Sequence, residues 1–148
     1  MTKTVMYGVV SEQAPANLLP IYHFKPEKVV LFYSDSMHEN ALRLEKILKR
    51  NQYKIDLVNF PAHDNYKILF KVINDSIDET VGCQHIFNIT GGTKPMSLAM
   101  FENASSLLEN EYINIYLDLT SKKIQILGKK ESTPTPININ ISLRDYLE

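Results

Sequence analysis

The sequence predicts an α/β, Rossmann-like fold: a mainly parallel sheet with helices on both faces and an antiparallel C-terminal hairpin. Three observations support this prediction. Apolar strand patterns alternate with amphipathic helical patterns over the first two-thirds of the 148 residues, which is the order of a parallel sheet with crossover helices. Two further strand patterns, 112–119 and 122–127, are separated only by Thr120 and Ser121, which indicates a hairpin. Hydrophobic residues make up 44% of the chain, enough for one domain with a core.

The other expected strands are of two kinds. The segments 4–10, 28–34 and 85–89 are almost continuously apolar, as strands are when helices cover both faces of the sheet. The segments 53–59 and 137–141 alternate apolar and polar side chains, which is typical of a strand with one buried face. We expect 53–59 to lie near an edge of the sheet.

Helical periodicity fills the gaps between these strands. Asp35 or Ser36 is expected to cap one helix, and a second runs from Tyr66 to near Gly82 with Asp64 as a candidate cap. Apolar side chains recur along both at the spacing of one helical face. Those faces consist of Met37, Ala41, Leu44 and Leu48, and of Tyr66, Leu69, Phe70, Ile73 and Ile77.

Three more helices are expected. A short one runs from Asn17 to about Tyr22, after a polar loop at 11–17. A long one, 95–108, is apolar on most sides and therefore needs burial on more than one face. The last begins at 142 and stops after barely two turns. We therefore expect a single domain over 1–148, from a natural protein that continues further.

The stretch 89–97, Ile-Thr-Gly-Gly-Thr-Lys-Pro-Met-Ser, carries the strongest chemical signal. It joins an apolar strand to a helix, and its glycines let the backbone come close to a ligand. A helix N-terminus offers free N–H groups and suits an anion such as phosphate. Two threonine hydroxyls and Lys94 add donors. Because the upstream glycine of the Walker motif is missing, an ordinary strand-to-helix turn with a solvated lysine remains the alternative.

A second polar loop is expected beside this turn. In open parallel sheets, ligands bind outside the carboxyl ends of strands, where the strand order reverses. The first and fourth strands are the best candidates for that position, which brings Ser11, Glu12 and Gln13 beside 90–94. We expect Glu12 to be a solvated acid, because a carboxylate repels phosphate.

Composition narrows the class of protein. The formal net charge is −1, so no direct DNA binding is expected. Cys83 is the lone cysteine, which excludes an internal disulfide and fits a reducing, cytoplasmic compartment. No apolar run approaches membrane-spanning length. The histidines share no metal-like spacing, so neither a metal nor another cofactor is expected; they are His23, His38, His63 and His85.

Four segments together resemble the CARF domains, the CRISPR-associated Rossmann-fold sensors. They are 10–13 (Val-Ser-Glu-Gln), 88–94 (Asn-Ile-Thr-Gly-Gly-Thr-Lys), 96–99 (Met-Ser-Leu-Ala) and 142–147 (Ser-Leu-Arg-Asp-Tyr-Leu). The chain is most similar to the group fused to restriction-endonuclease-like nucleases in type III CRISPR systems. The diglycine segment is the most specific of the four, and the others support it by position.

The resemblance implies a homodimeric sensor of cyclic oligoadenylate in antiviral signalling, with cyclic tetra-adenylate (cA4) as the expected ligand. The resemblance also implies that ligand binding switches an effector, which we expect to lie outside these 148 residues, because nothing after Leu147 can hold a nuclease. The turn amides and Lys94 are expected to hold phosphates, and Ser11 and Gln13 to contact ribose or adenine. The expected ligand-binding residues are Ser11, Gln13, Thr90, Gly91, Gly92, Thr93, Lys94 and Ser97.

Two alternatives stay open. Some CARF domains are ring nucleases that cleave their ligand without a metal, through attack of a ribose 2′-OH on the adjacent phosphate. Lys94 and Ser97 are then the candidate catalytic residues, although the sequence offers no obvious general base. The other alternative is an ordinary nucleotide-binding domain, which needs no dimer.

Overall fold

The computed structural model describes residues 3–61, 65–80, 82–107, 111–127 and 135–136. Its strands are β1 Thr4–Val9, β2 Lys28–Ser34, β3 Lys54–Phe60, β4 Gln84–Asn88, β5 Glu111–Asp118, β6 Lys123–Leu127 and β7 Thr135–Pro136. Its helices are α1 Ala14–Phe24, α2 His38–Arg50, α3 Tyr66–Asp75 and α4 Lys94–Ser105, with a short 3₁₀ helix, η1 Asp35–Met37, before α2. In this described part, no helix has the length and apolar character needed to span a membrane.

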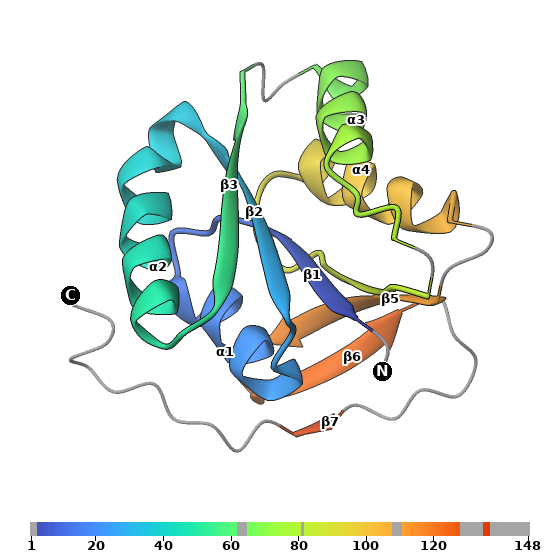
Figure 1. Cartoon of the computed structure of the whole chain (residues 1–148). Coiled ribbons are helices and arrows are strands. Elements are labelled where there is room, and N and C mark those ends of the chain that lie inside the picture. Colours follow the sequence, from blue (N-terminus) through green and yellow to red (C-terminus); the bar gives the residue numbers. More distant parts are fainter. Residues whose placement is uncertain (1–2, 62–64, 81, 108–110, 128–134, 137–148) are drawn as a thin grey trace.

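The strands of the described part form one sheet in the order β3-β2-β1-β4-β5-β6-β7 (Figure 1). The pairs from β3 to β5 are parallel, whereas β6 pairs with β5 and β7 with β6 in antiparallel fashion. The predicted fold class is therefore confirmed, together with the C-terminal hairpin and the edge position of 53–59. The strand order reverses between β1 and β4, the two strands expected to carry the site.

Two hydrophobic clusters lie on opposite faces of the sheet. One joins β1 and β2 to α1 and α2, through buried side chains such as Leu18 and Leu44. The other joins the opposite face to α3 and α4, through side chains such as Ile73 and Met100. Figure 1 shows the two pairs of helices on either side of the strands. Because both faces are covered, the carboxyl-terminal edge of the central strands is where a ligand can reach the sheet.

Some predicted boundaries were wrong. Helix α1 begins at Ala14 and not at Asn17, because Pro15 fits the first helical turn and the Asn17 side chain is buried. Helix α3 ends at Asp75, well before Gly82. Ser76 is its C-cap, and the segment beyond it is held outside the helix by Asp78, which forms a 2.7 Å salt bridge with Lys3 and accepts from the Thr80 N–H at 2.9 Å.

The predicted helix caps also need correction. The N-cap of α2 is Met37, without a side-chain hydrogen bond, so neither Asp35 nor Ser36 caps that helix. Asp35 instead accepts a 2.9 Å hydrogen bond from Asn59 Nδ2. Asn65 caps α3 by accepting from the Ile68 N–H at 3.3 Å. The predicted cap Asp64, the strand 137–141 and the helix from 142 lie outside the described residues.

Candidate functional site

A groove opens at the carboxyl-terminal edge of β1, β2 and β4. Its volume is about 510 Å³, within the range of roughly 300–1,000 Å³ typical of small-molecule sites. Three segments far apart in sequence form its walls: the loop after β1, the turn after β2 and the diglycine turn before α4. The lining residues are Val9, Val10, Ser11, Glu12, Gln13, Ser34, Ser36, Met37, Gly92, Thr93 and Met96.

The diglycine turn lies against the end of β1 so closely that only glycine fits. A Cβ built on Gly91 meets the Val9 carbonyl oxygen at 2.6 Å. Gly92 has a φ of +84°, which side chains other than glycine rarely adopt, and a Cβ there meets Val9 Cγ1 at 2.7 Å. The two glycines thus bring the turn directly onto the neighbouring strand.

The amides of this turn lack strong hydrogen-bond acceptors within the described part of the protein. Among the described residues, no acceptor is found for the N–H groups of Gly91, Gly92 and Lys94. The Thr93 N–H reaches only the Met96 sulfur, at 3.4 Å, and a thioether is a weak acceptor. Helix α4 begins here, with Pro95 in its first turn. Free amides at a helix N-terminus form an anion-binding arrangement.

Two buried asparagines hold the walls in place. Asn88, at the end of β4, donates to the Ala16 carbonyl at 2.9 Å and accepts from the Thr90 N–H at 3.0 Å. Asn17 accepts from the Ser11 N–H at 2.9 Å and donates to the Val9 carbonyl at 2.9 Å. Each side chain therefore joins a loop of the groove to a fixed element.

Sequence reasoning misses the role of both asparagines. The sequence pattern puts Asn17 at the boundary between a loop and a helix. The usable signal is Asn88 itself, since a polar side chain at the end of an apolar strand becomes buried and needs partners.

The predicted residues divide into two groups. Ser11, Gln13, Gly92 and Thr93 line the groove, and Glu12 joins them. Gly91 is buried beneath the turn, whereas Lys94 is exposed at the start of α4 and does not line the groove.

Two predicted side chains are engaged within the protein. Thr90 Oγ1 donates to Asn88 Oδ1 at 2.5 Å and accepts from the Leu117 N–H at 2.9 Å. The Ser97 hydroxyl faces the carbonyls of Ile89 and Gly91, at 3.3 and 3.4 Å. Both hydroxyls therefore stabilise the turn, and the structure does not bring Ser97 into the groove.

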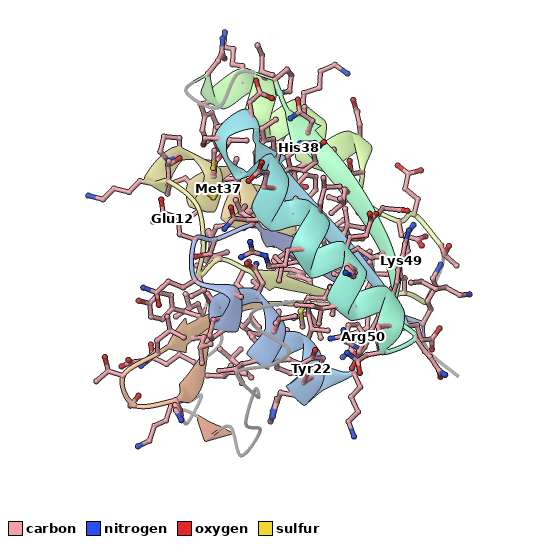
Figure 2. The ribbon with its side chains drawn as sticks, turned by 90° about the vertical axis from the view of Figure 1, so that its left-hand side faces the viewer. Glu12, Tyr22, Met37, His38, Lys49 and Arg50 are labelled. Atoms are coloured by element: carbon pink, nitrogen blue, oxygen red, sulfur yellow. The ribbon has the colours of Figure 1, made fainter. Side chains whose placement is uncertain are left out.

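The third wall is one that the sequence pattern does not mark as part of a site. It consists of Ser34, Ser36 and Met37, from the end of β2 and from η1. Figure 2 shows Met37 at the start of α2, with Glu12 at the same end of the molecule. When residues 35–36 are interpreted as a helix cap, their place in this wall is missed, because helix caps and ligand contacts use the same small polar residues.

Three titratable groups with shifted pKa values, Tyr7, His85 and Asp78, do not line the groove. Burial raises the pKa of Tyr7 and lowers that of His85. Tyr7 Oη lies 3.0 Å from His85 Nδ1 and accepts from the Asp78 N–H at 2.9 Å. Hydrogen bonds from Lys3 and then Thr80 lower the pKa of Asp78. This hydrogen-bonded network extends from the hydrophobic core to the amino-terminal edge of the sheet, so its role is structural. The described residues contain no group of three or more His, Cys, Asp or Glu side chains arranged to hold a metal ion.

A family model of the Card1 CARF domain matches residues 5–146. The chain belongs to this family. The resemblance inferred from the diglycine segment is thus confirmed at the level of the CARF domain. Among curated proteins, no sequence matches this CARF chain.

Solved structures share the fold over nearly the whole CARF chain. One is Can2 from Sulfobacillus thermosulfidooxidans in complex with cyclic tetra-adenylate, with 25% identity and a TM-score of 0.78 over 97% of this chain. Another is protein VC1899 from Vibrio cholerae, with 16% identity and a TM-score of 0.85 over 97%. A third is a type III CRISPR defence DNA nuclease activated by cyclic oligoadenylate, with 16% identity and a TM-score of 0.77 over 93%. The chain spans only 40%, 38% and 21% of those three proteins.

Proposed function

We propose that this CARF chain is a dimeric sensor domain that binds cyclic oligoadenylate, with cA4 as its ligand, in type III CRISPR signalling. The observation that carries the proposal is the groove at the β1–β4 switch point, where free amides of the diglycine turn meet the Ser11–Gln13 loop. The turn holds a phosphate, and the loop contacts the attached nucleoside. The likeness to Can2, whose structure contains this ring, supports the choice of ligand.

A second copy of the chain completes the site in this proposal. Lys94, Leu98 and Phe101 follow one another at helical spacing along α4, so they share a face. Leu98 is 57% exposed and Phe101 is 36% exposed. Together they form an apolar surface that begins one helical turn from the diglycine turn. Packing of this face on its own copy places two equivalent grooves about a two-fold axis. Each groove then holds an equivalent part of a ring, and the exposed Lys94 lies where the two grooves meet.

The proposal is limited to binding and sensing of the ring. One of the three longer proteins is a DNA nuclease activated by cyclic oligoadenylate. Switching of such an effector is proposed only for a longer protein that contains this chain, and not for these residues. Cleavage of the ring is less well supported than binding, because the Ser97 hydroxyl faces backbone carbonyls.

Isothermal titration calorimetry with cyclic tetra- and hexa-adenylate tests the ligand. We expect binding of cA4 at one ring per two chains. Absence of heat with both rings contradicts the proposal, and tighter binding of the hexa-adenylate corrects the ring size. Chromatography of the ring after long incubation shows whether it is cleaved.

Light scattering tests the dimer separately. Leu98→Arg is expected to give a monomer with weakened ring binding, because it places a charge in the apolar contact. Leu42→Arg is the matched control, since Leu42 is 45% exposed on α2, away from this face. A wild-type monomer in the presence of the ring rules out the shared site.

A further inference from the structure

The groove has two chemically different parts. Around Gly92 and Thr93 it presents backbone amides, which suit phosphate. The third wall, from the end of β2 and from η1, presents the half-buried side chain of Met37, and the nearly buried Val10, which follows β1, also lines the groove. A phosphate gains nothing from such a surface, because its charge requires polar partners. The wall therefore suits an apolar portion of the same ligand.

This wall is fixed in place before any ligand arrives. The Val10 N–H donates to the Phe32 carbonyl at 2.8 Å, which extends the pairing of β1 with β2 up to the groove. Asp35 is held by Asn59 of the edge strand, at 2.9 Å. Met37 is half-buried and packs on the core cluster beneath α2. A wall held from both sides costs little entropy to order on binding.

Hydroxyl groups border the apolar surface. Ser36 is exposed in the groove, and its Oγ lies 3.2 Å from Ser34 Oγ. A serine hydroxyl both donates and accepts hydrogen bonds. It can therefore pair with an amino group or with a ring nitrogen on the edge of a heterocycle.

We propose that Ser34, Ser36, Met37 and Val10 form a base subsite for the adenine of the nucleotide whose phosphate lies on the diglycine turn. This inference rests on the proposed function. The Met37 thioether packs against the face of the purine, since sulfur makes favourable contacts with aromatic rings. The Ser36 hydroxyl pairs with the polar edge of the base. The subsite then selects a purine, whereas the turn recognises only the backbone of the ring.

Methyl NMR of the 148-residue chain tests the position of the base directly. The chain contains five methionines, and Met37→Leu identifies the Met37 methyl signal by its disappearance. On titration with cA4 we expect a ring-current shift of that signal. The methyl signal of Met100, which is fully buried in the other core cluster, is expected not to shift. Pyrophosphate, which carries no base, is expected to leave the Met37 signal unmoved.

Calorimetry of variants tests the energetic contribution. Met37→Ala is expected to weaken cA4 binding by about tenfold, since apolar contact with the base is lost. Met37→Leu keeps the apolar volume and is expected to stay within about threefold of wild type. Ser36→Ala, at an exposed position outside the core, gives a second variant that does not depend on packing; we expect weaker binding of the adenine ring.

The outcomes separate this inference from the proposed function. If wild type binds cA4 but the Met37 signal does not move, or if Met37→Ala and Ser36→Ala both bind as wild type, the base lies elsewhere and the subsite is wrong while the sensor proposal stands. If wild type does not bind the ring at all, both fail.

Discussion

Replacing Gly92 with alanine tests whether the diglycine turn depends on its closeness to β1. Two separate costs arise at this position. The φ of +84° strains an alanine by about 1–2 kcal/mol. The new Cβ would lie 2.7 Å from Val9 Cγ1 and 3.1 Å from Met96 Sδ, and overpacking costs about 1–3 kcal/mol. Together they lower the free energy of unfolding by about 2–5 kcal/mol.

The other glycines supply matched controls that separate these costs. Gly82 has a φ of +79° and open space around its Cβ direction, so Gly82→Ala is expected to show only the backbone strain. Gly91 has no positive φ, but its Cβ would meet Val9 O at 2.6 Å; Gly91→Ala shows the steric cost alone, about 1–3 kcal/mol. Around Gly8 the nearest contact is an ordinary 3.5 Å, so Gly8→Ala is expected to be close to neutral.

Urea unfolding of the four variants measures these differences, provided that the slope of each transition is unchanged. Ring binding is measured on the same samples, and we expect Gly91→Ala and Gly92→Ala to lose affinity while Gly82→Ala retains it. If Gly92→Ala is no less stable than Gly82→Ala, the contact with β1 does not constrain the diglycine turn. The explanation that only glycine fits against β1 at this position is then refuted.

Three further predictions concern the ligand, the supporting asparagines and pH. Lys94→Ala is expected to weaken cA4 binding by roughly tenfold or more, because a charge-assisted phosphate contact is lost; Lys67→Ala, an exposed lysine of α3, is the control, and equal affinities contradict the role of Lys94. Asn88→Ala leaves buried backbone groups without partners, so we expect the free energy of unfolding, measured with urea, to fall by about 2–3 kcal/mol, together with weaker ring binding. Wild-type stability would show that the turn is held by other contacts. Stability is expected to fall on acidification in two steps, below the ordinary pKa of 6.5 for His85 and below 3.8 for Asp78, because each folded-state pKa is lowered and the unfolded chain therefore takes up the proton first. His85→Gln is expected to remove the upper step and Asp78→Asn the lower one, as followed by thermal unfolding across this pH range; profiles that keep both steps disagree with these assignments.

Sequence reasoning is most successful where a local pattern and its structural consequence coincide. The segment 28–34 is apolar from Val29 to Tyr33 and forms β2 with the predicted bounds. The diglycine turn is recognisable because two adjacent glycines between a strand and a helix indicate a backbone that turns tightly or lies close to a neighbour. Errors arise where a side chain has two possible partners. Asp35 was expected to cap α2, yet it accepts from Asn59, which lies 24 positions later in the chain.

The sequence by itself determined the alternation of strands and helices, the family, and the place of the diglycine turn between a strand and a helix. These follow from periodicity and from residue types over short distances, where neighbours in sequence are neighbours in space. Only the tertiary structure decided that Asn17 and Asn88 support the groove, that Ser97 turns toward backbone carbonyls, and that Met37 forms a third wall. Those outcomes depend on which strands become adjacent and on which groups are then buried without water, and a buried polar group takes whichever partner the fold places within reach.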